Sequence, residues 1–332
     1  MKKNPIGKYL LQNWYYYVFA FGSMALSVFL DMLAPLVTLH IVDDVLVGHK
    51  MELLWKYLAA FLLIGAAKAL FQYIKEFLFD VSSVRVASQM RDNLFRHVQR
   101  LSVEYFDKNN TGELLARVRD DVDRIWDILG FAGMLILEGL ICIMMAMVSM
   151  VKLDLPLTLV SVAILPFVAG IAIRLEKELD RVYDAISAEN AVMNTVAQEN
   201  LAGVRTVKSF AREPYEIKKF RKHNQKYCDL NMDQARVLMK YDPAISFLTK
   251  LMRVLVLLAG GYGVIHGRIT LGVLTAFMEY TSKITWPIEN VGWLGNCFAS
   301  AIASNKKLNK ILAEEPQIAE PENPVELSKL PG

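Results

Sequence analysis

Polar residues inside the apolar stretches of this 332-residue chain are the side chains whose chemistry most needs an explanation. Eight such residues stand out: Asp31, Lys68, Gln72, Glu138, Lys250, Arg253, Glu279 and Lys283. An ionisable group in lipid costs several kcal/mol unless it pairs or faces water. These residues therefore predict either ion pairs between helices or a wet pathway along them.

Both interpretations fit the spacing. Lys68 and Gln72 share one stripe of a helix with Lys75 and Glu76, which indicates a wet cavity or a charged neighbour. Glu279 precedes Lys283 by four residues, the favourable order for a pair that neutralises itself. The charges could thus fix helix registry by pairing, or they could line a translocation cavity that contacts polar or amphipathic cargo.

The stretches that hold these residues are long enough to cross a bilayer, which takes roughly 20 apolar residues. They lie near 14–41, 53–79, 128–151, 155–173, 244–265 and 271–288, and hydrophobic residues make up 54% of the chain. The aromatic run Trp14–Tyr17 is typical of a membrane interface. We expect an all-α membrane protein with six transmembrane helices, in which Pro243 starts the fifth span.

The distribution of basic residues predicts the orientation of these spans. The three short turns hold only Lys50, Lys152 and Arg268, whereas the N-terminus, the long loops 80–126 and 174–242 and the segment 306–310 hold 27 Lys and Arg. Because basic residues favour the cytoplasmic side, both termini and both long loops are expected there. A multi-pass protein of the cell membrane follows, and the nearly balanced charge of +3 gives no signal for nucleic acid.

Both long loops show the apolar periodicity of helices rather than of disorder. A continuous helix from about Leu53 to Leu101 would be roughly 70 Å long, more than twice the thickness of the membrane. A second long helix follows the fourth span. Two helical hairpins are therefore expected to project into the cytoplasm, with tips near 107–111 and 210–214.

The two tips combine aromatic and turn-forming residues. At the first tip Asn110 can cap a new helix, with Glu113 completing a capping box, and Gly112 suits a sharp reversal. At the second tip Phe210 precedes Pro214, which fits the start of a helix. Such aromatic tips on stiff helices predict a docking surface more readily than ordinary solvated loops.

Other chemistry is not indicated. The three cysteines, Cys142, Cys228 and Cys297, have no spacing that suggests a metal, a disulfide framework or a redox site. No GxxxxGK[ST] phosphate loop occurs in the sequence. We therefore predict no catalytic, cofactor-binding or metal-binding residue in this chain.

At this point the sequence resembles the transmembrane half of an ATP-binding cassette (ABC) exporter, of the six-helix half-transporter type found among bacterial multidrug and lipid exporters. The residues that carry the resemblance are "SVEYFDKNNTGELLARVRDDVDRI", "QENLAGVRTVKSFAREPYEIKKF", "ITLGVLTAFMEYTSKITWPI" and "KKLNKILAEEP". They occur in order and span almost the whole chain. One departure, Lys310 where family members often have Arg before the final "IL", is conservative.

The resemblance implies roles for both tips as coupling helices that sit in grooves of nucleotide-binding domains, about Glu104–Glu113 and Ser209–Tyr215. The coupling residues would be Tyr105, Phe106, Asp107, Asn110, Thr111, Gly112 and Glu113, with Ser209, Phe210, Ala211, Arg212, Glu213 and Pro214. It also implies a domain-swapped dimer with an identical or different second half, ATP and Mg bound by the nucleotide-binding domain, and export by alternating access.

The chain then divides into a transmembrane domain, 1–312, and a Pro-rich acidic linker, 313–332, toward an absent nucleotide-binding domain. We expect a piece of a longer ATP-hydrolysing translocase or, alternatively, a subunit that uses a separate ATPase. A membrane docking, gating or sensing module without its own transport role remains an alternative. An ion channel fits less well, because the intramembrane charges have mixed signs.

Overall fold

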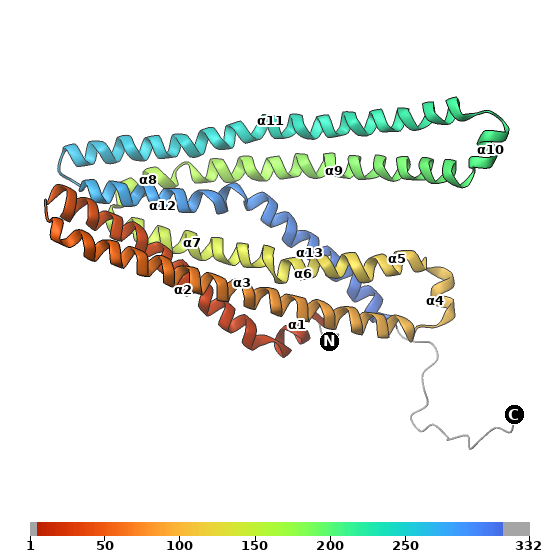
Figure 1. Cartoon of the computed structure of the whole chain (residues 1–332), viewed down its shortest axis with the longest axis horizontal. Coiled ribbons are helices and arrows are strands. Elements are labelled where there is room, and N and C mark those ends of the chain that lie inside the picture. The colour runs from red at the N-terminus through yellow and green to blue at the C-terminus, as the bar shows by residue number, and fades with distance from the viewer. Residues whose placement is uncertain (1–4, 315–332) are drawn as a thin grey trace, which may run out of the picture. The chain divides into compact units, whose positions relative to one another are not determined.

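The computed structural model describes residues 5–314, and every regular element in this part of the chain is a helix (Figure 1). The predicted linker lies outside the described residues beyond Glu314. The helices of the first half are α1 (Pro5–Gln12), α2 (Trp14–His40), η1 (Ile41–Val47), η2 (Met51–Leu53), α3 (Leu54–Gln99), α4 (Val103–Lys108), α5 (Thr111–Ala116), η3 (Arg117–Asp121) and α6 (Val122–Leu129). The second half contains α7 (Phe131–Leu153), α8 (Leu155–Val162), α9 (Leu165–Ala202), α10 (Val204–Ser209), α11 (Glu213–Ile265), α12 (Leu271–Glu289) and α13 (Val291–Ala313).

The chain divides into two compact units, and several helices contribute to both. Unit 1 comprises Met1–Asp31, Leu63–Glu138 and Cys297–Gly332, and unit 2 comprises Met32–Leu62 and Gly139–Asn296. Each unit contains one helical hairpin, so each is described by itself.

Unit 1 holds the first hairpin, formed by α3, α4 and the run α5–η3–α6. Its core is an apolar cluster in which α3 contributes Val86, Ala87, Met90, Leu94 and Val98. Leu114, Val122 and Ile125 from the other leg complete it, together with Tyr9 of α1 and Leu308 and Ile311 of α13. Burial of these side chains therefore joins both legs of the hairpin to the last helix.

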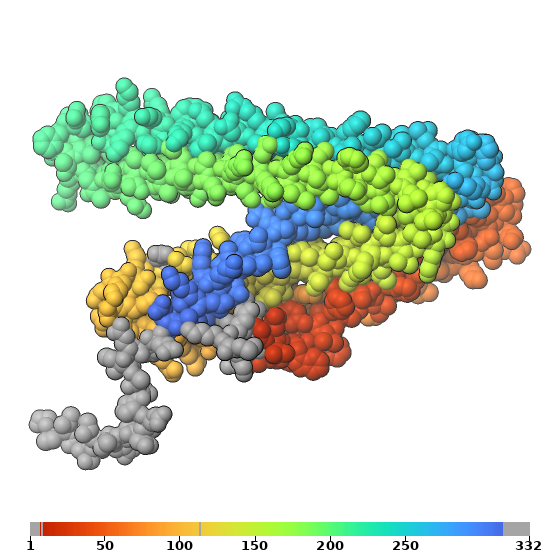
Figure 2. Space-filling view, turned by 180° about the vertical axis from the view of Figure 1, so that it is seen from behind, coloured from red at the N-terminus to blue at the C-terminus, as the bar shows by residue number. Residues whose placement is uncertain are grey.

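Unit 2 holds the second hairpin, in which α9 and α11 run side by side and α10 joins their ends (Figures 1 and 2). Near the start of α9 the two helices share an apolar cluster of Val168, Ala172 and Ile245. Pro166 lies in the first turn of α9 and separates it from α8, because proline cannot donate the backbone hydrogen bond of a continuing helix.

The loops between spans in unit 2 are closed by polar contacts. The Asp43 carboxylate accepts hydrogen bonds from Gly272 N at 2.7 Å and from Thr270 Oγ1 at 2.5 Å, and thereby caps the start of α12. The Tyr280 hydroxyl donates to the Met32 backbone carbonyl oxygen at 2.7 Å. These bonds attach α12 to the end of α2 and to η1.

Five helical stretches among the described residues are long and apolar enough to cross a membrane: Trp14–Val47, Met51–Gln99, Leu114–Leu153, Leu155–Ala202 and Glu213–Ile265. They include the first five predicted spans. Helix α12 matches the predicted sixth span in position but is more polar, since it carries Glu279 and Lys283. Its role as a span stays a prediction.

The expected long helices are present, and one expected helix start is wrong. Helix α3 runs unbroken over 46 residues, close to the predicted range 53–101. Helix α11 runs over 53 residues with Pro243 in its interior, so Pro243 does not start the fifth span. A proline is tolerated inside a helix when neighbouring helices support the freed backbone groups, and the α9 cluster packs on Ile245, two residues away.

Candidate functional site

The end of the first hairpin is the short helix α4 with the turn that follows it. The Asn110 side chain caps α5 by accepting a hydrogen bond from Gly112 N at 2.8 Å, as predicted. The side chain of Glu113, which was expected to complete the capping box, lies outside the described part of the structure. Asn109 donates to the Tyr105 carbonyl oxygen at 2.8 Å and fixes the other side of the turn.

The two aromatic residues of α4 are anchored rather than fully displayed. Tyr105 and Phe106 meet edge to face with ring centroids 5.9 Å apart, and both pack on the apolar cluster of unit 1. Asp107, Thr111 and Gly112 complete the end, and Thr111 and Gly112 are exposed. Packing on the apolar cluster of unit 1 therefore anchors α4 to the rest of the hairpin.

A polar cavity of about 460 Å³ lies beside α4, between the hairpin end and the last turns of α13. Its lining includes four cationic side chains, Lys108, Arg117, Lys307 and Lys310. Lys108 forms an ion pair with Glu104, and this carboxylate raises the pKa of Lys108. The first hairpin end is thus basic on the side that faces α13.

The end of the second hairpin has a different build. The short helix α10 spans Val204–Ser209, so only Ser209 of the predicted coupling helix Ser209–Tyr215 lies in it, and the coupling role of this segment stays a prediction. Gly203 ends α9, and α10 begins at the next residue. Phe210, Ala211 and Arg212 form the turn, and α11 begins with Glu213 and Pro214.

Phe210 at this turn is 74% exposed, in contrast to the packed aromatics of α4. Ala211 has a positive φ of 51°, which is uncommon for a residue with a side chain and makes the turn tight. The Arg212 guanidinium lies over the Tyr215 ring at 5.0 Å from its centroid. The turn therefore presents one aromatic ring to its surroundings and stacks a second one under a cation.

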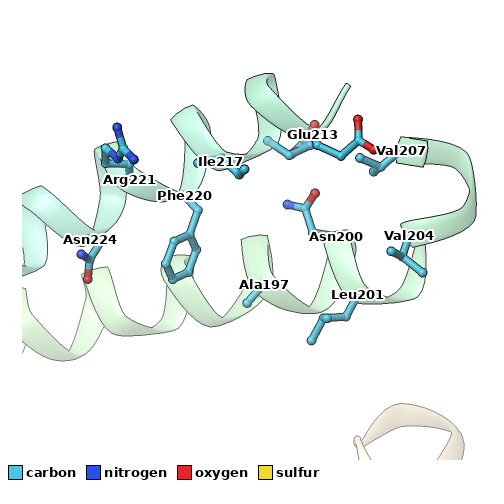
Figure 3. Close-up of a pocket in the computed structure, with 11 residues that line it drawn as sticks. Ala197, Asn200, Leu201, Val204, Val207, Glu213, Ile217, Phe220, Arg221 and Asn224 are labelled. Atoms are coloured by element: carbon cyan, nitrogen blue, oxygen red, sulfur yellow. The ribbon is translucent and has the colours of Figure 1, made fainter. Parts of the chain in front are cut away.

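An apolar groove of about 620 Å³ runs between α9 and α11 next to this turn (Figure 3). Leu201, Val204, Val207 and Ile217 are among its lining residues. In Figure 3, Phe220 points from α11 toward α9, and Asn200 points from α9 toward α11. The second hairpin end thus combines an exposed ring with a neighbouring apolar surface.

Ion pairs involve Asp31, Lys68 and Glu138 among the residues predicted to carry charge in the membrane. Lys68 Nζ lies 2.5 Å from Asp31 Oδ1, and both side chains are partly exposed. Glu138 Oε1 lies 2.9 Å from the ammonium of Lys75, whose side chain is only 1% exposed. The predicted pairing is present for Asp31, Lys68 and Glu138, and the role of these pairs in helix registry or in a cargo cavity stays a prediction.

The remaining polar candidates lie in different surroundings. Gln72 donates to Glu76 at 3.1 Å on the same helix. Lys250 is exposed, and Arg253 Nε is buried without a hydrogen-bond partner within residues 5–314. Glu279 and Lys283 are partly buried on α12, and their mutual pairing stays a prediction.

Three buried charged residues were missed as site candidates. The sequence identifies Lys75 only as part of the polar stripe of α3, whereas in the structure its side chain is buried. Asp121 is 5% exposed and accepts a hydrogen bond from Ser304 Oγ at 2.8 Å, which ties η3 to α13. Glu189 is 4% exposed on α9 and contacts His223 and Lys226 of α11. The hydrogen-bond partners of these three residues lie 34 to 183 residues away in the sequence, beyond what helical periodicity reveals.

The family comparison gives a match over most of the chain. The family model described as ABC transporter transmembrane region matches residues 17–288. This range contains both hairpins and all six predicted spans apart from the first three residues of the first.

The chain is also similar to individual curated proteins, with sequence identities between 23% and 28%. The chain is 28% identical over 310 residues to the uncharacterized ABC transporter ATP-binding protein YknU of Bacillus subtilis, covering 93% of this chain and 53% of the relative. It is 27% identical over 322 residues to the multidrug resistance-like ATP-binding protein MdlA of Escherichia coli, covering 96% and 54%. It is 23% identical over 288 residues to the ATP-dependent lipid A-core flippase of Syntrophus aciditrophicus, covering 87% and 48%. The chain spans about half the length of these curated relatives.

Proposed function

The chain belongs to the family of ABC transporter transmembrane regions, and from this premise we propose that it is the substrate-translocating domain of an ATP-driven exporter. The observation that carries the proposal is the family match over residues 17–288, which includes both hairpins. The proposed cargo is amphipathic compounds, lipids or peptides. The names of the multidrug resistance-like and lipid flippase relatives support amphipathic compounds and lipids.

The proposed partners are a nucleotide-binding domain and a second transmembrane half, identical or different, that exchanges helices with this one in a domain-swapped dimer. ATP and Mg would be bound by the nucleotide-binding domain, and this chain would supply no catalytic residue. The acidic segment 313–332 would lead toward that domain. The excess of Lys and Arg in the hairpins supports a cytoplasmic position for both hairpins and both termini in the cell membrane.

In this mechanism the hairpins transmit movement. Helix α3 has 46 residues and α11 has 53, so at about 1.5 Å per residue each is roughly 70–80 Å long and exceeds the ~30 Å of the membrane. When ATP draws the nucleotide-binding domains together, the hairpin ends docked on them would move as well. The legs would carry this movement to the spans, which switch from inward-facing to outward-facing.

The two hairpin ends would dock through their aromatic residues. Phe210 is exposed and would insert into a groove of a nucleotide-binding domain, while Phe106 would support the docking face of α4 from below. Aromatic side chains that fill a pocket at the centre of an interface carry much of its binding energy.

The test uses the full transporter with Cys142, Cys228 and Cys297 replaced and a cysteine introduced by Ser282→Cys, an exposed position on α12. The rate at which a water-soluble maleimide modifies this cysteine is measured with and without Mg-ATP, beside the rate of ATP hydrolysis. We expect Phe106→Ala and Phe210→Ala to retain hydrolysis and to lose the ATP-dependent change in modification rate.

The matched control is Phe95→Ala, because Phe95 is 54% exposed in the last turns of α3 and is not one of the proposed docking residues. It should behave as the parent protein does. A normal ATP-dependent change in both end variants would exclude the docking role of the hairpin ends.

A role of the intramembrane charges in a cargo cavity is a further part of this proposal. Glu138→Gln and Lys68→Met each remove one member of an ion pair. If cargo-dependent stimulation of ATP hydrolysis is unchanged in both variants, these pairs serve registry alone.

A further inference from the structure

The second hairpin contains a series of hydrogen bonds between α9 and α11 that the function proposed above does not use. Glu178 accepts from Lys240 Nζ at 3.2 Å and from the Tyr241 hydroxyl, and Tyr183 accepts from Gln234 at 3.0 Å. Nearer the turn, Glu189 contacts His223 and Lys226, and Glu199 accepts from Lys219 Nζ at 3.4 Å. We call these contacts the polar rungs.

Two of the rungs are spaced to lie on one face of α9. Glu178 and Glu189 are 11 residues apart, which corresponds to three helical turns and puts both carboxylates on the stripe that faces α11. Successive partners run in the opposite direction along α11, as antiparallel helices require. The rungs therefore define one register of α9 against α11.

Apolar packing contributes little to this register. From residue 174 onward the buried residues of α9 are Leu179, Glu189 and Val196, and α11 has no buried residue from Glu213 to Ala244. Two apolar side chains leave the alignment of such long helices weakly determined, because many registers would bury similar area. Hydrogen-bonded groups must instead specify it.

Glu189 differs from the other rungs because its carboxylate is withdrawn from water. Its side chain is 4% exposed, against 38% for Glu178 and 62% for Glu199. His223 Nδ1 lies 2.7 Å from Oε1, and Lys226 Nζ lies 2.5 Å from Oε2. A buried carboxylate is tolerated only when both oxygens are satisfied, so a slip of α11 that removed these partners would be strongly opposed.

The charge state supports this arrangement. The hydrogen bonds from Lys226 and from His223 hold the pKa of Glu189 below its ordinary value, so the carboxylate is ionised near neutral pH. An ionised carboxylate can only accept hydrogen bonds, so His223 Nδ1 carries the proton and donates it.

We propose that Glu189 is a positioning residue that fixes the register of α9 against α11 and so holds α10 and Phe210 in place for docking. The inference rests on the function proposed above. Glu189 lies 13 residues before the end of α9, about 20 Å along the hairpin. A slip by one turn would displace the hairpin end by about 5 Å and misalign Phe210 with its groove.

The experiment measures register and coupling separately. In the full cysteine-free transporter, spin labels at Ala202→Cys and Lys218→Cys, two exposed positions outside the groove lining, report the distance between the ends of α9 and α11. The Ser282→Cys modification assay reports the ATP-dependent response. We expect Glu189→Gln to broaden the distance distribution and to reduce the ATP-dependent response about tenfold, an effect within the range for coupling residues.

Matched variants make the result specific. Glu199→Gln changes an exposed rung and should leave both readouts as in the parent protein. The exchange Glu189→Lys with Lys226→Glu restores an opposite pair at the same place and should recover both readouts. Lys226→Gln removes one partner of Glu189 and changes an exposed side chain. It should broaden the distance distribution and reduce the ATP-dependent response less than Glu189→Gln does, and it provides the test if Glu189→Gln does not fold.

An unchanged distance distribution in Glu189→Gln and Lys226→Gln would overturn the proposal whatever the response to ATP. A broadened distribution with a normal response, in a background where Phe210→Ala abolishes the response, would also overturn it while leaving the proposed function intact. If Phe210→Ala itself has no effect, the docking function fails, and the positioning role fails with it.

Discussion

The two hairpins resemble each other in outline and differ in what holds them. In the first, α3 buries Val86, Ala87, Met90, Leu94 and Val98 in a cluster shared with the other leg and with α13. In the second, the part of α9 beyond residue 173 buries two apolar residues and one carboxylate. The first hairpin is therefore specified by apolar packing and the second by hydrogen bonds.

The two hairpin ends also differ in how much apolar surface they expose. At the first end Tyr105 and Phe106 pack on their own unit, whereas at the second end Phe210 is 74% and Leu201 75% exposed. Exposed apolar surface of this kind marks an interaction site in a soluble part of a protein. The aromatic residues of the first hairpin end thus pack within their own unit, whereas the second end leaves Phe210 and Leu201 exposed, as the proposed docking of Phe210 requires.

The largest effect expected from this comparison concerns the buried ammonium of Lys75 on α3, which pairs with Glu138 on α7 within unit 1. Glu138→Leu would leave Lys75, which is 1% exposed, without its 2.9 Å partner. Removing one member of a buried pair costs about 3–5 kcal/mol. We expect the free energy of unfolding of the detergent-solubilised protein, from denaturant titration, to fall by that amount.

The double variant Lys75→Met with Glu138→Leu is the control for this prediction. Replacing both members of a buried pair with apolar groups is often close to neutral, so it should recover most of the loss. A loss that persists in the double variant would show that packing around Glu138, rather than the unpaired ammonium, is responsible.

The apolar cluster of the first hairpin gives the next largest effect. Leu94 is 2% exposed in this cluster, and Leu94→Ala should lower the free energy of unfolding by about 2–4 kcal/mol. Leu201→Ala in the second hairpin, at 75% exposure, should change it by less than about 0.5 kcal/mol. The measurement is the same denaturant titration.

Phe95 supplies the local control, since it neighbours Leu94 on α3 but is 54% exposed. Phe95→Ala should have little effect on unfolding. Equal losses in Leu94→Ala and Leu201→Ala would contradict the distinction between a packed and a hydrogen-bonded hairpin.

The features that the sequence predicted correctly depend on residues that are close together in the chain. Helix α3 followed from unbroken apolar spacing between Leu53 and Leu101, and the structure places it at Leu54–Gln99. The Asn110 cap followed from a side chain with a known local preference, and its bond to Gly112 N is present. These features depend on residues close together in the chain.

Features that depend on distant partners were predicted less well. Lys75 was one of several polar residues on a stripe, and only its contact with Glu138, 63 residues away, distinguishes it. Glu189 lies in a charged segment that reads as solvated, and its burial follows from partners on α11. The break between α9 and α10 at Gly203 was not predicted, because an isolated glycine is often tolerated within a helix.

A smaller effect is expected from the aromatic residues of the two hairpin ends. Phe106 packs on the first cluster, so Phe106→Ala should lower the free energy of unfolding by about 1–3 kcal/mol as well as impair docking. Phe210→Ala should leave unfolding within about 0.5 kcal/mol of the parent while impairing docking. Denaturant titration beside the maleimide assay separates the two, and equal destabilisation would mean that Phe210 is packed in the assembled protein.

The smallest effect is expected at the outermost polar rung. Lys219 Nζ lies 3.4 Å from Glu199 Oε2, and the two side chains are 39% and 62% exposed. Because water screens such a pair and holding two long side chains costs conformational entropy, Lys219→Ala should change the free energy of unfolding by only about 0.2–0.5 kcal/mol. The distance between labels at 202 and 218 should also be unchanged, since the buried rung at Glu189 still sets the register. A broadened distance in Lys219→Ala would mean that the register is shared among all the rungs, and that burial does not single out Glu189.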